Sequence, residues 1–94
     1  MKSIHLIITG RVQGVGFREW LTHQANCFHL SGWVRNLGED AVEALISGSA
    51  PAVEECERRC WQGPPFASVT EVVARDAAPP ERPGFQRRVS VPRG

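Results

Sequence analysis

The residues that could do chemistry in this 94-residue chain gather in one short segment, residues 10–18, which reads GRVQGVGFR. Glycines at positions 14 and 16 allow the positive φ values that turn successive backbone N–H groups toward one point. They also remove the Cβ atoms that would block a ligand there. Arg18 can add a guanidinium group, which binds two oxygens of an anion at once. These residue types at this spacing predict a binding site for phosphate or a similar anion.

The segment differs from the two best-known phosphate-binding loops. No Lys-Ser/Thr pair follows the glycines, and their spacing is not that of the dinucleotide-binding motif. The pattern alone leaves open a plainer alternative, a tight turn from a strand into a helix with Arg18 paired to an acid. Glu19 is a candidate for that acid, although we favour a solvated helix position for it.

The apolar residues on either side of the segment predict the elements that position it. Apolar and polar residues alternate over residues 4–9, with the two-residue period of a strand. After the segment, a spacing of three and four predicts a helix with one face toward a core: Phe17, Trp20, Leu21, Ala25 and Phe28. A helix N-terminus presents unpaired N–H groups and a positive dipole end, so these elements support an anion site.

The rest of the chain completes an α+β pattern. It predicts, in order, two strands joined by a polar turn, a helix, a strand, a proline-rich loop and a possible short last strand: residues 32–37, 41–47, 49–61, 67–76, 77–84 and 85–91. This order predicts a ferredoxin-like split βαβ sandwich, with one antiparallel sheet of order 4-1-3-2 and two helices on one face. Strands one and two are then parallel, and their carboxyl ends meet at the edge that holds the glycine loop and Asn36.

Two motifs of the chain closely resemble those of the acylphosphatase family. The first is GRVQGVGFR, and the second is GWVRN at residues 32–36, which is followed by a hairpin that ends in VEA. Chain length, helix order and the segment GPPFASV also fit over nearly all residues. The resemblance implies a small cytoplasmic hydrolase that splits carboxyl-phosphate anhydrides into a carboxylate and inorganic phosphate, without a metal or cofactor.

The resemblance also implies a role for each matching residue. Arg18 binds the phosphoryl group and Asn36 orients the attacking water. The backbone N–H groups that cradle the phosphate are those of Gln13, Gly14, Val15, Gly16 and Phe17. A carboxylate leaves readily, so the site needs positive potential and an aligned water rather than a strong base.

One departure from the family pattern lies in the hairpin turn. The family usually carries Asp-Gly there, whereas this chain has Glu39 and Asp40. We therefore expect Asp40 to adopt a left-handed conformation, which Asp tolerates moderately well.

Composition narrows the class of partner. The net charge is +1, and ten Arg and one Lys are spread along the chain rather than gathered in a block. This distribution gives no reason to expect nucleic acid or an acidic membrane as the main partner. The apolar run at the N-terminus is too short for a signal sequence or a membrane span. We expect a single cytoplasmic domain, residues 1–94, that is a monomer.

The cysteines and histidines predict no metal site. The three cysteines lack the paired spacing of a zinc site or a disulfide scaffold, and the three histidines show no ligand spacing. Cys56 and Cys60 lie four residues apart on the predicted helix, where we expect them to pack as small apolar groups. Cys27 is expected to be partly exposed near a helix end.

Two other functions remain as alternatives at this stage. Nucleic-acid-binding modules of the same fold expose aromatic residues on their central strands. Here the residues expected to face away from the helices include no aromatic pair: His5, Ile7, Thr9, Glu43 and Leu45. The second alternative is a non-catalytic anion-binding module, comparable to the related domain in the fused maturation factors of nickel-iron hydrogenases, because its fold and cradle would look the same.

Overall fold

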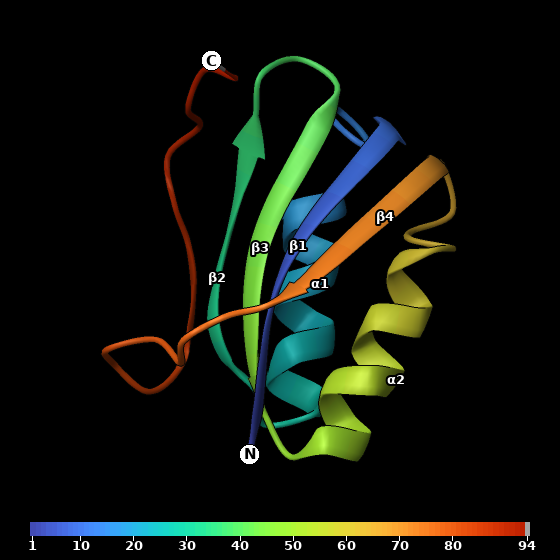
Figure 1. The fold of residues 1–94 in the computed structure, drawn as a ribbon. Helices are drawn as coiled ribbons and strands as arrows, with labels where there is room; N and C mark the ends of the chain where they lie inside the picture. The colour runs from blue at the N-terminus through green and yellow to red at the C-terminus, as the bar shows by residue number, and fades with distance from the viewer. Residues whose placement is uncertain (94) are drawn as a thin grey trace.

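A computed structural model describes residues 1–93 and shows two layers, a sheet with two helices packed on one of its faces (Figure 1). The elements in chain order are β1 (Lys2–Arg11), α1 (Phe17–Cys27), β2 (Ser31–Leu37), β3 (Ala41–Gly48), α2 (Ala50–Cys60), β4 (Ser68–Asp76) and β5 (Phe85–Arg87). The prediction of a ferredoxin-like α+β sandwich is confirmed. The predicted domain covers residues 1–94, and its last residue, 94, lies outside the residues that the structure describes.

The sheet differs from the prediction at one edge. The order is β4-β1-β3-β2-β5, so the expected order 4-1-3-2 holds for four strands, but β5 extends the sheet beyond β2. Because β5 pairs with β2 in parallel, the sheet is mixed rather than wholly antiparallel. The physical reason is that the free edge of β2 offers backbone groups that need partners. The end of the chain supplies them.

The tail after β5 continues along the same edge. The N–H of Arg88 donates to the carbonyl of Val34 at 2.8 Å, and the N–H of Val91 donates to the carbonyl of Asn36 at 3.1 Å. The N–H of Gly38 in turn donates to the carbonyl of Val91 at 2.9 Å. The tail therefore supports the strand that carries Asn36 as far as the hairpin turn.

Strand direction brings the carboxyl ends of two strands together. β1 and β2 are each antiparallel to β3, and β5 is parallel to β2. The carboxyl ends of β1 and β2 therefore lie at one edge of the sheet, the upper edge in Figure 1, while β5 runs in the same direction and ends level with Val34. The predicted meeting of the first two strand ends is confirmed.

The core lies between the sheet and the helices. Its fully buried side chains come from both helices and from the sheet, and they include Leu6, Ile8, Phe17, Leu21, Val34, Val42, Ile46, Val53, Cys56 and Cys60. The predicted burial of the two helical cysteines is confirmed, and Cys27 is exposed as expected. A hydrogen bond that the Cys60 thiol donates to Cys56, together with burial, raises the pKa of Cys60, which therefore stays protonated.

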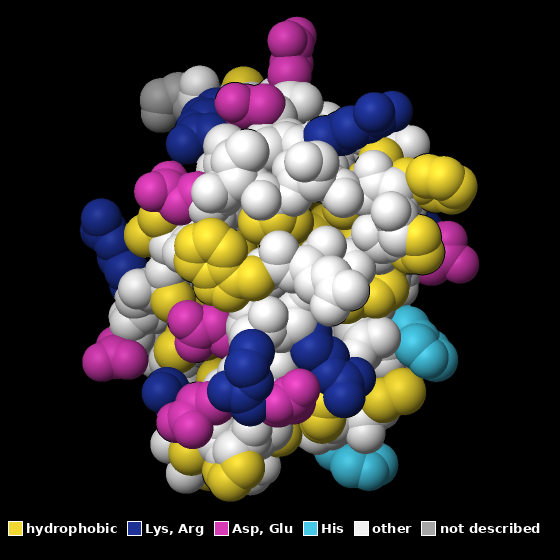
Figure 2. Space-filling view, turned by 90° about the vertical axis from the view of Figure 1, so that its right-hand side faces the viewer, with side chains coloured by type: hydrophobic (Ala, Val, Ile, Leu, Met, Phe, Trp, Pro, Cys, Tyr) yellow, Lys and Arg dark blue, Asp and Glu magenta, His cyan; other side chains and the backbone are white. Residues whose placement is uncertain are grey.

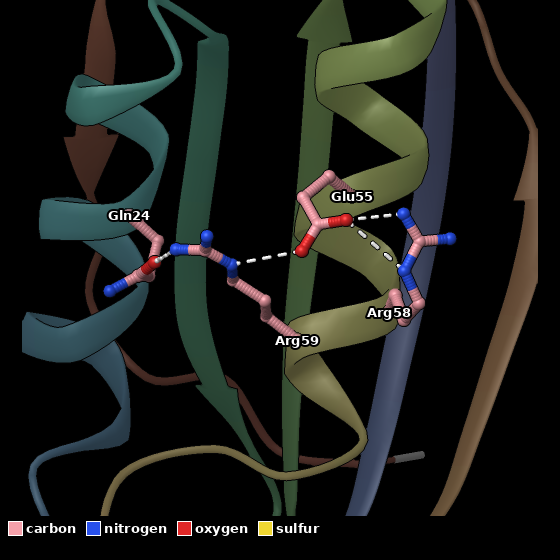
Figure 3. Close-up of polar contacts among 4 residues, drawn as sticks. All are labelled: Gln24, Glu55, Arg58 and Arg59. Carbon is pink, nitrogen blue, oxygen red and sulfur yellow. Dashed lines mark hydrogen bonds and ion pairs between the residues drawn. The ribbon is translucent and has the colours of Figure 1, made fainter.

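The outer face of α2 carries charges of both signs. Figure 2, which views the side of the molecule that holds α2, shows acidic and basic side chains interspersed. Figure 3 shows how they connect the helices: Arg59 donates to Glu55 at 3.1 Å and to Gln24 of α1 at 2.8 Å, while Arg58 also pairs with Glu55. The hydrogen bonds from Arg58 and Arg59 lower the pKa of Glu55. Exposed pairs of this kind stabilise a fold only slightly.

The hairpin turn corrects the expectation for Asp40. Gly38 takes the left-handed conformation, with φ of 61°, and among residues 1–93 the one non-glycine residue with positive φ is His29. The turn places its left-handed residue one step after β2 ends, where glycine meets no Cβ penalty. Asp40 therefore has negative φ, and its carboxylate accepts a hydrogen bond from Arg93 of the tail at 3.3 Å.

The face of the sheet away from the helices holds a small charged network. Glu43 of β3 accepts hydrogen bonds from His5 Nε2 and Arg35 Nε, each at 2.6 Å. Arg35 and Arg88 lie over the ring of Trp33, each with its guanidinium carbon 4.8 Å from the ring centroid. Burial acts to raise the pKa of Glu43, but the bonds from Arg35 and His5 outweigh it and hold that pKa below 4.5.

The lowered pKa of Glu43 predicts how stability depends on pH. The folded state binds this proton more weakly than the unfolded state, so the stabilisation is complete above the ordinary pKa and disappears as pH falls through the folded-state value. We expect Glu43→Gln to lower the free energy of unfolding by about 1 kcal/mol at neutral pH. The deficit should shrink as pH falls below 4.5, as measured by urea unfolding over a pH series. Glu81→Gln, in an exposed loop, is the control; a deficit independent of pH would contradict this account.

Candidate functional site

A cavity of about 230 Å³ lies at the edge where β1 and β2 end. Its lining combines the glycine loop, the start of α1 and the ends of two strands: Val12, Gln13, Gly14, Gly16, Phe17, Arg18, Glu19, Asn36 and Arg87. Both side chains predicted to act on the substrate, Arg18 and Asn36, line this one cavity. The fold therefore brings together residues from segments far apart in the sequence.

The glycine loop has the backbone conformation that the sequence predicts. Gly14 and Gly16 have φ values of 72° and 79°. No backbone carbonyl of residues 1–93 accepts a hydrogen bond from the N–H groups of residues 13–17. Gly16 is also the N-cap of α1, and no side chain caps the helix there. The loop and the helix end thus offer several N–H donors and a positive dipole to one ligand.

The space in front of the loop is open. A Cβ atom built on Gly14 or Gly16 would meet no protein atom within 4 Å. Glycine is therefore needed here for its backbone conformation and for the approach of a ligand, since no neighbouring protein group crowds either position.

The side chain of Gln13 has a role that the sequence analysis missed. Its amide nitrogen donates to the carbonyls of Gly38 and Ala41, each at 2.9 Å. Both carbonyls belong to the hairpin between β2 and β3, so Gln13 fastens the loop to the hairpin that follows Asn36. A glutamine in a glycine-rich loop gives no sign of these partners, because they lie far away in the sequence.

Removing the Gln13 side chain should loosen the loop. If the substrate is the acyl phosphate that the sequence resemblance implies, we expect Gln13→Ala to lower kcat/KM about tenfold, because misplaced donors weaken stabilisation of the transition state. Steady-state kinetics would measure this loss, and Gln62→Ala, at an exposed position after α2, is the matched control. A variant with unchanged kinetics would show that the loop holds its shape without this anchor.

Arg18 lies in the first turn of α1 and is half-buried at the cavity wall. Within residues 1–93 it forms no ion pair with any acidic side chain. Glu19 lines the same cavity but is exposed and does not pair with Arg18, in agreement with the solvated position that we favoured. The guanidinium group is therefore available to a ligand.

Asn36 reaches the cavity because of strand alternation. Val34, two residues earlier in β2, is fully buried against the helices, so Asn36 shares that face near the end of the strand. Its backbone carbonyl is held by the N–H of Val91. The side-chain amide is thus positioned by a strand that is paired on both sides, with β3 and with the tail.

A second hollow lies elsewhere, beside Trp33 and the proline-rich loop. Its volume is about 450 Å³, and its walls include Pro79, Arg82 and Arg88. It is larger than the cavity at the strand ends, but it contains no helix N-terminus and no glycine loop. The glycine loop, the N-terminus of α1, Arg18 and Asn36 all belong to the smaller cavity.

Residues 1–93 were also considered for membrane-spanning helices and for clusters of metal ligands. Neither helix in this range is long and apolar enough to cross a membrane. In the same range, no three or more His, Cys, Asp or Glu side chains are gathered so that they could hold a metal ion.

The fold and the cavity together define a class, that of ferredoxin-like domains with a glycine loop between the first strand and the first helix that leads into a cavity. A family model described as acylphosphatase matches residues 4–87. An acylphosphatase of Acidiphilium cryptum is 54% identical over 90 residues, which cover 96% of this chain and 99% of that protein. The chain belongs to the acylphosphatase family, and it is a hydrolase that splits acyl phosphates into a carboxylate and inorganic phosphate.

Solved structures agree with this assignment. The structure of an acylphosphatase from Coxiella burnetii matches with a TM-score of 0.89 at 33% identity, over 93% of this chain and 92% of that one. Full-length HypF, crystallised in a phosphate- and nucleotide-bound form, matches with a TM-score of 0.91 at 26% identity. The match covers 99% of this chain but 12% of HypF, so the same fold also occurs as a small part of a much larger protein.

Proposed function

We propose that this chain hydrolyses acyl phosphates by in-line attack of a water molecule on a phosphoryl group held by the glycine loop and Arg18. The observation that carries this mechanism is that unpaired loop N–H donors, the unpaired Arg18 and Asn36 share one cavity, whose lining includes Gln13, Gly14, Gly16 and Phe17 but not Val15. Backbone donors fixed before the reaction stabilise developing charge without reorganisation.

In the proposed reaction, the water oxygen forms a bond to phosphorus as the bond between phosphorus and the acyl oxygen breaks. The bonding electrons leave with the carboxylate, which needs no proton at neutral pH. The water keeps one hydrogen as part of the product, and the other proton passes to a phosphoryl oxygen. The reaction therefore yields a carboxylate and dihydrogen phosphate, which then equilibrates with the solvent.

Asn36 is the residue proposed to position the water. Its amide has an oxygen that accepts and a nitrogen that donates, so it can hold a water molecule in a fixed orientation. Because the acyl phosphate has a good leaving group, orientation rather than strong basicity is what the reaction needs.

The proposal is tested by hydrolysis of benzoyl phosphate in the presence of EDTA, with wild type and Asn36→Ala side by side. We expect the wild type to cleave this substrate without added metal and Asn36→Ala to lose about a hundredfold or more in kcat. Asn26→Ala is the matched control, because Asn26 is exposed on α1 away from the cavity. An unchanged kcat in Asn36→Ala would remove the positioned water from the mechanism, and a folded wild type that cleaves nothing would leave a non-catalytic anion-binding module.

The proposal extends to the domain organisation, location and partners of the protein. We propose a single acylphosphatase-like domain over residues 1–94 that works as a cytoplasmic monomer, with no metal, no cofactor and no nucleic-acid partner. The modest net charge, the mixed charges around α2 and the reduced cysteines support this setting. Light scattering of the purified protein would test the monomer.

A further inference from the structure

Arg87 is a residue of the cavity that the family motifs do not include. It is the last residue of β5 and pairs in parallel with Val34, whose side chain is buried on the helix side of the sheet. Phe85, two residues earlier, packs against the core on that side. Strand alternation therefore directs Arg87 toward α1, and it lines the cavity together with Arg18 and Asn36.

The next residue, Arg88, is directed the opposite way. Its guanidinium group lies over Trp33, on the face of the sheet away from the helices. Two arginines that are neighbours in the sequence thus serve different faces, and only Arg87 belongs to the cavity.

The cavity is lined by two arginines, Arg18 and Arg87. A phosphoryl group with about two negative charges already meets the loop N–H groups, the helix dipole and Arg18. Within residues 1–93, neither Arg18 nor Arg87 forms an ion pair, and Glu19 is the one acidic residue in the lining. A second unpaired guanidinium group therefore remains for another anion.

The position of Arg87 indicates which part of the substrate it meets. The glycine loop follows β1, whereas β5 is three strands away in the sheet order, across β3 and β2. With about 4.8 Å between neighbouring strands, β5 lies roughly 14 Å from β1. Arg87 therefore enters the cavity from the side of β5, so a phosphoryl group held by the loop leaves this side to the rest of the substrate.

Building on the proposed function, we propose that Arg87 binds a second negative group on the acyl part of the substrate. The enzyme then prefers acyl phosphates whose acyl group carries a carboxylate or a phosphate. Both groups offer paired oxygens that fit the planar guanidinium fork of Arg87. The preference is electrostatic, and because Arg87 is exposed to solvent, added salt weakens the preference.

A matched series of rigid substrates tests this preference: 4-carboxybenzoyl phosphate, 4-phosphonobenzoyl phosphate and the neutral 4-carbamoylbenzoyl phosphate. We expect the wild type to show a kcat/KM about fivefold higher for the anionic substrates than for the neutral one. The ratio should fall toward one in Arg87→Gln and should be partly retained in Arg87→Lys. The carboxylate and phosphonate arms show which of the two anions is preferred.

Arg88→Gln is the matched control, since it removes the same charge from the neighbouring residue on the opposite face. We expect it to keep the wild-type ratio. If the wild type cleaves all three substrates with equal kcat/KM, or if Arg87→Gln lowers all three by one factor, the inference is overturned and the proposed function stands. If the wild type cleaves none of them, the proposed function fails, and the inference fails with it.

Discussion

Arg18→Ala is expected to lower kcat/KM for benzoyl phosphate by at least about a hundredfold. Arg18 is half-buried, free of ion pairs within residues 1–93 and placed at the start of α1 beside the unpaired N–H groups of the loop. Loss of one preorganised donor to developing charge typically costs a factor of about a hundred to a thousand in rate. Arg58→Ala, at an exposed position on α2, removes the same charge elsewhere and should leave the kinetics unchanged.

The same variant separates the role of Arg18 from that of Asn36. An arginine that contacts the phosphoryl group binds ground state and transition state alike, so Arg18→Ala should also weaken inhibition by inorganic phosphate. Asn36→Ala removes a group that holds water, and it should leave the inhibition constant for phosphate nearly unchanged. If both variants weaken phosphate inhibition equally, this division of roles is wrong.

Gly32→Ala should cause the largest loss of stability. Gly32 is the second residue of the strand that carries Asn36 and has φ of 137°, and a Cβ atom there would lie 1.8 Å from the backbone oxygen of Leu45. The backbone of β3 cannot yield without breaking its pairing with β2, so we expect a loss of about 3 kcal/mol or more. That is a large share of the roughly 5–15 kcal/mol by which such domains are stable.

Urea unfolding of Gly32→Ala and Gly84→Ala would separate two causes of that loss. Gly84 also has positive φ, at 90°, but a Cβ atom there would meet nothing within 4 Å. We expect Gly84→Ala to cost only about 1 kcal/mol, which is the price of a left-handed alanine. Equal losses in the two variants would mean that backbone conformation, and not the close approach to β3, decides the effect.

The parts of the fold that sequence predicts are those set by local patterns. The two-residue period of β1, the helical spacing from Phe17 to Phe28 and the glycines of the loop each depend on neighbouring residues, and each appears as expected. Arg18 and Asn36 line one cavity, and their meeting could be predicted because the expected order of strands and helices places the start of α1 beside the end of β2.

The features that sequence did not predict depend on distant partners. Alternation places Phe85 and Arg87 on one face of a strand, but nothing local shows that this strand adds to β2 in parallel. The hydrogen bonds of Gln13 likewise depend on carbonyls of a hairpin that begins many residues later. The prediction for the hairpin turn was wrong by two residues, because Gly38 and not Asp40 adopts the left-handed conformation.

The pairing of the tail along β2 has a consequence for how the enzyme becomes active. Gln13 and Arg87 lie near opposite ends of the chain and yet line one cavity, and much of the sheet joins strands that are distant in sequence. Contacts of this range form late and slowly, because the chain must first close long loops. The complete cavity lining, with Arg87, therefore exists only once the last strand has left the ribosome and has docked on β2.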